Sequence, residues 1–155
     1  MKKIVFTFLV FLIASLNGSA LHNFKNYKIE QHKFLSPKDF TPKSFITLLT
    51  EKYNKDTKVN TITMAGEFPN KWVKPKDVEY LISIMRSKQR CCSYMNVFSS
   101  YFPDQKAEVG GFAIIFLKSY ISNTKVNLGL TCSPNSDPKE IQKIENWYKN
   151  LNHKN

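Results

Sequence analysis

The cysteines are the side chains of this sequence best suited to chemistry. Cys91 and Cys92 are neighbours in the stretch "RSKQRCCSYMNVFSSYFP", and the chain has one more thiol, Cys132. In an oxidising compartment such thiols pair as disulfides. A bond from Cys132 to either neighbour would close a loop of about 40 residues and stabilise the fold by on the order of 3–4 kcal/mol. Helical register favours Cys91 as the partner, which leaves Cys92 as the alternative partner or as the leftover thiol.

A thiol could also act as a nucleophile. That chemistry needs a positive, partly exposed setting that lowers the thiol pKa, together with a general base. Arg90 precedes the cysteine pair and supplies positive charge. A base is missing, because the histidines fall in the predicted arm and tail: His22, His32 and His153. An enzyme of undetected type, with Cys91 or Cys92 as nucleophile, is therefore an alternative hypothesis.

Other motifs that carry chemistry do not occur in the sequence. There is no C-x-x-C pair and no H-E-x-x-H, the spacings typical of metal sites. The stretch "EVGGF" lacks the lysine and the spacing of a phosphate-binding loop. The carboxylates are scattered, and nothing marks a pair for acid–base work. The sequence thus predicts no catalytic residue, no cofactor and no metal.

The N-terminus "MKKIVFTFLVFLIASLNGSALHN" has the layout of a secretory signal peptide. Lys2 and Lys3 precede an apolar run from Ile4 to Leu16, and small residues stand at the positions expected before a cleavage site. The run is shorter than the roughly 20 residues that span a bilayer. We expect cleavage after residue 20, export to the periplasm or the extracellular medium, and no transmembrane span after cleavage.

The charge balance is strongly basic. The chain has 23 Lys and Arg against 12 Asp and Glu, a formal net charge of +11. Arg86 and Arg90 are its only arginines. Sequence-specific nucleic-acid recognition relies on arginine forks, so this composition argues against it. A lysine surface is usually solvated, and it can also attract an acidic partner or an anionic surface.

Apolar periodicity predicts helices along most of the chain. From Cys91 onward, apolar residues recur at the i, i+3, i+4, i+7 spacing of a helix until Pro103 ends the pattern. The stretch after residue 106 has the composition of a central strand, but its length favours a buried helix. The expected helices cover 42–54, 75–88, 91–102, 107–121 and the segment that begins at Pro138.

The segment 58–65 is the exception, because its β-branched residues alternate and predict a short strand or an extended link. The expected fold class is mainly α. It is a small single domain of four to five short helices, arranged as a bundle or as stacked helical hairpins, with at most a minor strand near 58–65. The expected organisation is a signal peptide at 1–20, an extended N-terminal arm at 21–40, one helical domain at 41–152 and a frayed tail at 153–155.

Two aromatic stretches are candidate contact surfaces. In "FPNKWVKP", the aromatic residues Phe68 and Trp72 alternate with Lys71 and Lys74, and aromatic side chains are enriched at interfaces. The denser stretch "CSYMNVFSSYFP" is expected to pack in the core, with a tyrosine-rich contact surface as the alternative.

Together these features predict an exported, non-enzymatic protein that binds another macromolecule in the bacterial envelope. An inhibitor or an immunity-type protein would be one example. The partner would be an envelope protein or an anionic surface. The competing hypotheses are the cysteine enzyme and a loose association with anionic envelope surfaces.

Overall fold

Prolines mark the start of three helices, where a missing backbone N–H leaves no hydrogen bond unmade. Thr41 caps the first, because its hydroxyl accepts from the Ser44 N–H while the Ser44 hydroxyl accepts from the Thr41 N–H. Asp137 caps the last by accepting from the Lys139 N–H at 2.8 Å. The three helices, each expected from the sequence, are α2 (Pro42–Lys55), α3 (Pro75–Ile84) and α5 (Pro138–Asn152).

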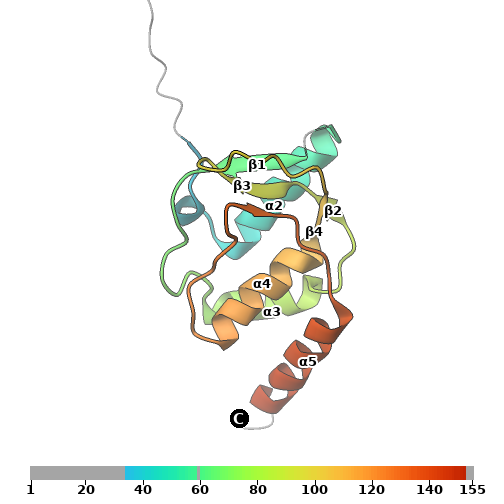
Figure 1. Ribbon diagram of the computed structural model, residues 1–155. Helices are drawn as coiled ribbons and strands as arrows, with labels where there is room; N and C mark the ends of the chain where they lie inside the picture. The colour runs from blue at the N-terminus through green and yellow to red at the C-terminus, as the bar shows by residue number, and fades with distance from the viewer. Residues whose placement is uncertain (1–33, 59, 153–155) are drawn as a thin grey trace, which may run out of the picture. The chain divides into compact units, whose positions relative to one another are not determined.

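The computed structural model describes residues 34–58 and 60–152 (Figure 1). The predicted signal peptide at 1–20, most of the predicted arm at 21–40 and the predicted tail at 153–155 lie outside these residues. The described end of the arm contains a short 3-10 helix, η1 (Pro37–Asp39). Within the described ranges, no helix is long and apolar enough to cross a membrane.

Helix α4 (Val109–Ile121) is the central helix of the described domain. It is apolar on nearly all sides, which is typical of a helix buried all round. Its two phenylalanines, Phe112 and Phe116, are fully buried. The sequence predicted this helix over 107–121; it starts two residues later because Ala107–Glu108 forms a short strand, β4.

A three-stranded sheet makes the fold α/β, so the expectation of a mainly α bundle or of stacked helical hairpins is wrong. Its strand order is β1-β3-β5. Strand β1 runs parallel to β3, with α3 in the connection, and β5 runs antiparallel to β3. A second pair, β2 with β4, is antiparallel. The bounds of the remaining strands are β1 (Thr61–Met64), β2 (Arg90–Cys91), β3 (Ser93–Asn96) and β5 (Thr131–Cys132).

The helix predicted over 91–102 does not exist. This stretch forms β2, then β3, then an irregular loop. In β3, Ser93, Tyr94 and Met95 are all buried, so the strand lacks the apolar–polar alternation that would have revealed it. The later members of the apparent helical stripe, Phe98 and Phe102, stand in solvent. Apolar residues that are buried in β3 and apolar residues that are exposed in the following loop happen to recur at helical spacing. For this reason the sequence did not reveal β3, the strand that pairs with β1.

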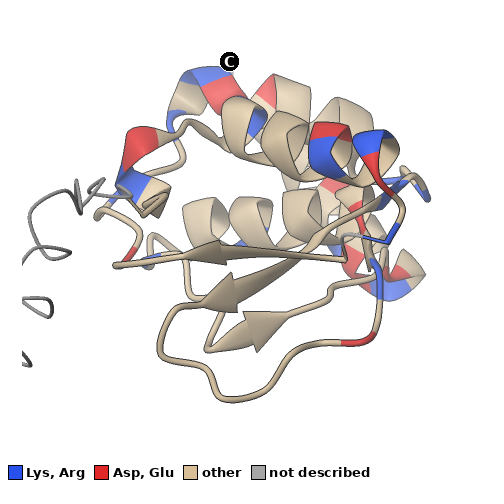
Figure 2. Cartoon of the chain, turned by 90° about the horizontal axis from the view of Figure 1, so that it is seen from above, with Lys and Arg blue, Asp and Glu red and all other residues tan. Residues whose placement is uncertain are grey.

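The helices lie in a layer on one side of the strands (Figure 2). Phe45 of α2 sits at the centre of this layer, fully buried. Its ring lies 5.6 Å from Phe116 of α4 and 6.4 Å from Tyr94 of β3, so it joins two helices to the sheet. Helix α5 packs on α4, through Ile141 and Ile144 among others, on the side away from the strands (Figure 1).

The other side of the sheet is covered by the loop that follows β3. Side chains alternate along a strand, so Ser93 and Met95 face away from the helices. The Ser93 hydroxyl donates to the Gln105 carbonyl at 2.6 Å, and the Thr61 hydroxyl donates to the Pro103 carbonyl at 3.5 Å. These bonds draw residues 97–105 back across the strands and bury Met95.

The N-terminus of α4 passes against two other backbone segments. A Cβ atom added at Gly110 would lie 2.5 Å from the Met85 carbonyl oxygen and 2.7 Å from that of Ser87. A Cβ added at Gly111 would lie 2.6 Å from the Pro134 carbonyl. Only glycine allows this approach, which explains two adjacent glycines in a helix that would otherwise favour alanine.

We predict that Gly110→Ala and Gly111→Ala each lower the free energy of unfolding by about 1–3 kcal/mol, because overpacking forces backbone to move. Helix propensity alone predicts the opposite sign, a gain of about 1 kcal/mol. Urea unfolding followed by circular dichroism measures the difference. A stabilised alanine variant would contradict the close approach.

Candidate functional site

No disulfide joins the cysteines of the described domain, so the predicted bond from Cys132 to Cys91 or Cys92 is wrong. The strand register gives the reason. Cys132 of β5 stands opposite Tyr94 of β3, whereas Cys91 of β2 stands opposite Ala107 in the other sheet. The expected bond rested on an oxidising compartment, and the false helical register served only to favour Cys91 over Cys92 as the partner.

The three thiols also lack the setting of a nucleophile. Cys91 and Cys92 are fully buried. Burial raises the pKa of the Cys91 thiol to about 12, and it raises the pKa of Cys92 and of Cys132 to about 11. At neutral pH such thiols are protonated, and the thiolate is the reactive species. In residues 34–58 and 60–152, no group of three His, Cys, Asp or Glu side chains could hold a metal ion.

Glu108 is one of two buried carboxylates among the described residues, the other being Asp77, and 9% of its side chain is exposed. Its Oε2 atom accepts from the Ser136 hydroxyl at 2.6 Å, from the Ser136 N–H at 2.8 Å and from the Lys88 ammonium at 3.3 Å. The Ser136 hydroxyl is the main reason that the pKa of Glu108 lies below its usual value. These bonds occupy the Oε2 atom as an acceptor. Glu108 therefore holds three segments together instead of serving as an acid or base.

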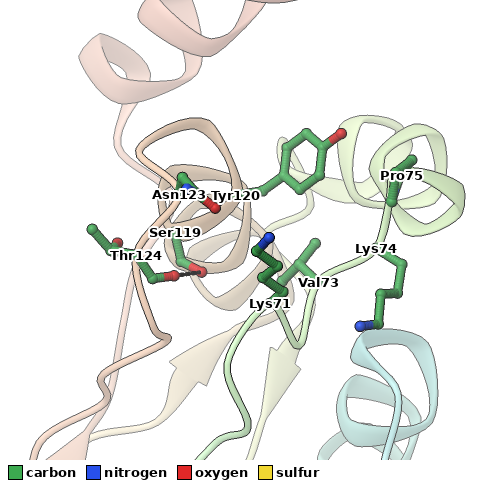
Figure 3. Close-up of a pocket in the computed structure, with 8 residues that line it drawn as sticks. All are labelled: Lys71, Val73, Lys74, Pro75, Ser119, Tyr120, Asn123 and Thr124. Carbon is green, nitrogen blue, oxygen red and sulfur yellow. Dashed lines mark hydrogen bonds between the residues drawn. The ribbon is translucent and has the colours of Figure 1, made fainter.

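In the predicted contact loop "FPNKWVKP", the aromatic residues are buried and the lysines are exposed. Phe68 and Trp72 are buried, 4.8 Å apart between ring centroids, so neither forms a contact surface. The Trp72 indole N–H donates to the Phe40 carbonyl at 2.7 Å. Lys71 and Lys74 are exposed and line a cavity of about 250 Å³ next to the end of α4 (Figure 3).

A second cavity, of about 420 Å³, lies at the carboxyl ends of β1 and β3. In open α/β sheets this is the edge where ligands bind. The Tyr94 hydroxyl and the Asn96 amide lie in it, 3.4 Å apart, and the apolar lining includes Leu128 and Leu130. An ion pair between Lys125 and Glu67 stands at its rim. We call this cavity the strand-end groove.

An exposed loop adjoins this groove. The loop spans residues 97–103, "VFSSYFP", and we call it the aromatic loop. Phe98 is 83% exposed, Tyr101 61% and Phe102 71%. Asn96 connects loop and groove, because its side chain accepts from the Phe98 N–H at 3.0 Å and its own N–H donates to the Leu130 carbonyl at 2.7 Å.

Charged residues are missing from the segments that build this side of the domain. The ranges 60–66, 91–103 and 126–136 contain no Lys, Arg, Asp or Glu. Figure 2 shows the consequence: the three-stranded sheet of β1, β3 and β5 carries no charged residue, whereas charges of both signs gather on the helices and their ends. Depletion of charge together with exposed aromatic side chains is typical of the core of a protein interface.

Sequence reasoning placed this surface in the wrong loop. It favoured core packing for the aromatic residues of 91–102, with a contact surface there as the alternative, and exposure for those of 68–75. Tyr94 does pack in the core, but Phe98, Tyr101 and Phe102 are exposed. The aromatic residues of 68–75 are buried. The signal that could have found the aromatic loop is the uncharged run that ends in "SSYFP", because serine and proline favour a turn over a helix.

Comparison with known proteins finds no matching family model, no matching curated protein and no matching solved structure. The geometry of the described residues therefore carries the functional argument.

We predict that the native protein reacts with iodoacetamide at pH 7.5 at least about 100-fold more slowly than an exposed cysteine, because two of its thiols are buried, Cys132 is half-buried, and the raised pKa values keep all three protonated. In denaturant without any reductant, mass spectrometry is expected to show three added labels. Rapid labelling of the native protein, or fewer than three labels after unfolding, would contradict this arrangement.

Replacing the buried carboxylate tests the electrostatics of the Glu108 cluster. Because the folded-state pKa of Glu108 is lowered, its charge adds stability above the ordinary glutamate pKa, and this stability is lost as pH falls through the lowered value. We predict that Glu108→Gln costs roughly 1–3 kcal/mol of unfolding free energy at pH 7. The difference from the wild type shrinks in acid.

Urea unfolding at several pH values measures both effects. Glu67→Gln is the matched control, because the Glu67 side chain is 82% exposed and pairs with Lys125 in solvent, where screening leaves such pairs little net effect. A cost for Glu108→Gln that does not change with pH would show that the charge of Glu108 is unimportant.

Proposed function

We propose that this protein is an exported, non-enzymatic binding protein whose partner is another protein, docked on the aromatic loop and the strand-end groove. The observation that carries the proposal is the exposure of Phe98, Tyr101 and Phe102 on a loop without charged residues, in an otherwise highly charged domain. The proposed export rests on the N-terminal sequence alone.

Exposed apolar side chains gather at this side. Eight large apolar side chains of the described residues stand exposed, and six belong to the aromatic loop or to segments hydrogen-bonded to the strand ends beside it. They are Phe34, Leu35, Phe98, Tyr101, Phe102 and Leu130. Such a concentration is costly in water and marks an interaction site. Aromatic anchors of this kind commonly supply most of the binding energy of an interface.

The aromatic loop is also held in place before any partner arrives. The Val97 N–H donates to the Met64 carbonyl at 2.9 Å, which fixes the loop to the end of β1. The Ser99 hydroxyl donates to the Tyr101 carbonyl and accepts from the Tyr101 N–H. A loop already ordered loses less conformational entropy on binding, so more of the contact energy appears as affinity.

The charge distribution suggests the chemistry of the partner. The aromatic loop itself is neutral, while the chain as a whole carries a net charge of +11. A partner with an apolar pocket and an acidic rim would match both features, since complementary charge speeds encounter and apolar contacts hold the complex. An inhibitor-type or immunity-type protein would act through such a contact.

Substitution on the aromatic loop tests the proposal. The double variant Phe98→Ser, Phe102→Ser removes two anchors whose side chains make no core contact, so thermal stability is expected to stay within a few degrees of the wild type. A partner is first captured from envelope extract by the wild type, then purified and titrated by calorimetry. We expect the double variant to lose at least about 30-fold in affinity, the effect of one strong hot-spot residue.

The matched control is Ile121→Ser, Leu151→Ser, which removes two exposed apolar side chains from the ends of α4 and α5. This control is expected to bind like the wild type. Equal binding by all three proteins, or equal loss in both double variants, would refute docking on the aromatic loop.

A further inference from the structure

Two residues that line the cavity beside the end of α4 have an unusual backbone conformation. Lys71 has φ of 51° and Asn123 has φ of 52°, and these are the non-glycine residues with positive φ in the described part of the chain. Both line the 250 Å³ cavity that also includes Val73, Ser119 and Tyr120. Side chains other than glycine rarely adopt this conformation, and clusters of such residues occur at functional sites.

Asn123 has a structural explanation. It follows the last turn of α4, where its N–H donates to the Tyr120 carbonyl and the Thr124 N–H donates to the Ser119 carbonyl. This is the usual way to end a helix, and asparagine tolerates the left-handed conformation there. No such helix end accounts for Lys71, where glycine would be less strained.

The buried residues that follow Lys71 hold its backbone in place. Trp72 is anchored through its indole N–H to the Phe40 carbonyl, and Val73 is 5% exposed. With these two residues facing inward, the Lys71 side chain extends toward the end of α4, while Lys74 extends the other way, toward α2 (Figure 3). Both lysines line the cavity, but only the Lys71 ammonium group is directed toward the end of α4.

That ammonium group has no carboxylate to neutralise it within residues 34–58 and 60–152. Every described ion pair involves another cation, and neither Asp nor Glu lines the cavity. The paired cations are Arg86, Lys88, Arg90, Lys118, Lys125 and Lys143.

The rest of the lining combines apolar and polar groups. Val73, Pro75 and the Tyr120 ring supply apolar surface, and Asn123 supplies an amide. The volume of about 250 Å³ lies below the usual range for drug-sized ligands, so a small group fits best. We propose that this cavity binds a carboxylate on a short apolar stem, with Lys71 as the cation that pairs with it.

Two sources offer this chemistry: a small free carboxylic acid and the carboxyl terminus of a peptide. The full-length protein is titrated with butyrate, with a short peptide ending in a free carboxylate after an apolar residue, and with the same peptide amidated. Chemical shifts in ¹H–¹⁵N spectra locate the binding. We expect saturable shifts at residues 71–75 and 119–124 with butyrate or the free peptide, and none with the amidated peptide.

Substitutions at residues 71 and 74 test whether binding needs the Lys71 ammonium group itself or any positive charge nearby. Lys71→Met keeps most of the side-chain stem and is expected to weaken binding at least about tenfold, as the loss of a charged hydrogen bond does. Lys74→Met is the matched control and is expected to bind within twofold of the wild type. Lys71→Gly is expected to raise the melting temperature and still abolish binding, because it relieves the backbone while removing the ammonium group.

Three results would overturn the proposal: no saturable shift with any carboxylate, equal binding by Lys71→Met and the wild type, or binding of inorganic phosphate without binding of carboxylates. The Phe98→Ser, Phe102→Ser variant is expected to bind the carboxylate normally. The proposal of a carboxylate site and the proposal of a protein-docking surface can therefore be refuted independently.

Discussion

The described domain depends on the close contact at the N-terminus of α4. Gly110 and Gly111 let the helix lie against the carbonyls of residues 85, 87 and 134, closer than any other residue type permits. Glu108, immediately before them, binds Ser136 and Lys88 and so ties the same segments together. Steric fit and a buried charge thus act at one point, where the segment after α3, the start of α4 and the segment before α5 meet.

The position of α4 determines which aromatic residues become core. With its N-terminus held, α4 directs Phe112 and Phe116 toward Phe45, and the "FPNKWVKP" loop folds Phe68 and Trp72 onto the same cluster. These rings fill the space around Phe45. The strands contribute Tyr94 from one face, and the loop after β3 covers the other face with its backbone, which leaves the Phe98, Tyr101 and Phe102 side chains directed at solvent. The exposed aromatic surface arises because the core needs no further aromatic residue.

The thiols follow the same geometry. Cys91 ends β2, Cys92 is the residue between β2 and β3, and both are fully buried, while Cys132 lies across from Tyr94. Burial keeps them protonated, and protonated thiols exchange poorly with disulfides. Their role in this structure is that of small apolar residues in the core, and the chemistry suggested by an adjacent cysteine pair is not supported by their surroundings.

The sequence by itself determined the elements that local rules govern. Prolines and capping residues located α2, α3 and α5, the apolar stretch after residue 106 located α4, and β-branched alternation located β1, because each signal depends on residues within one or two turns. Only the tertiary structure decided that 93–96 is a strand, since both of its faces are buried and its partners lie about 30 and 40 residues away. Tertiary structure also decided which aromatic loop faces water, because that choice depends on how the space around Phe45 is filled, and no local pattern records it.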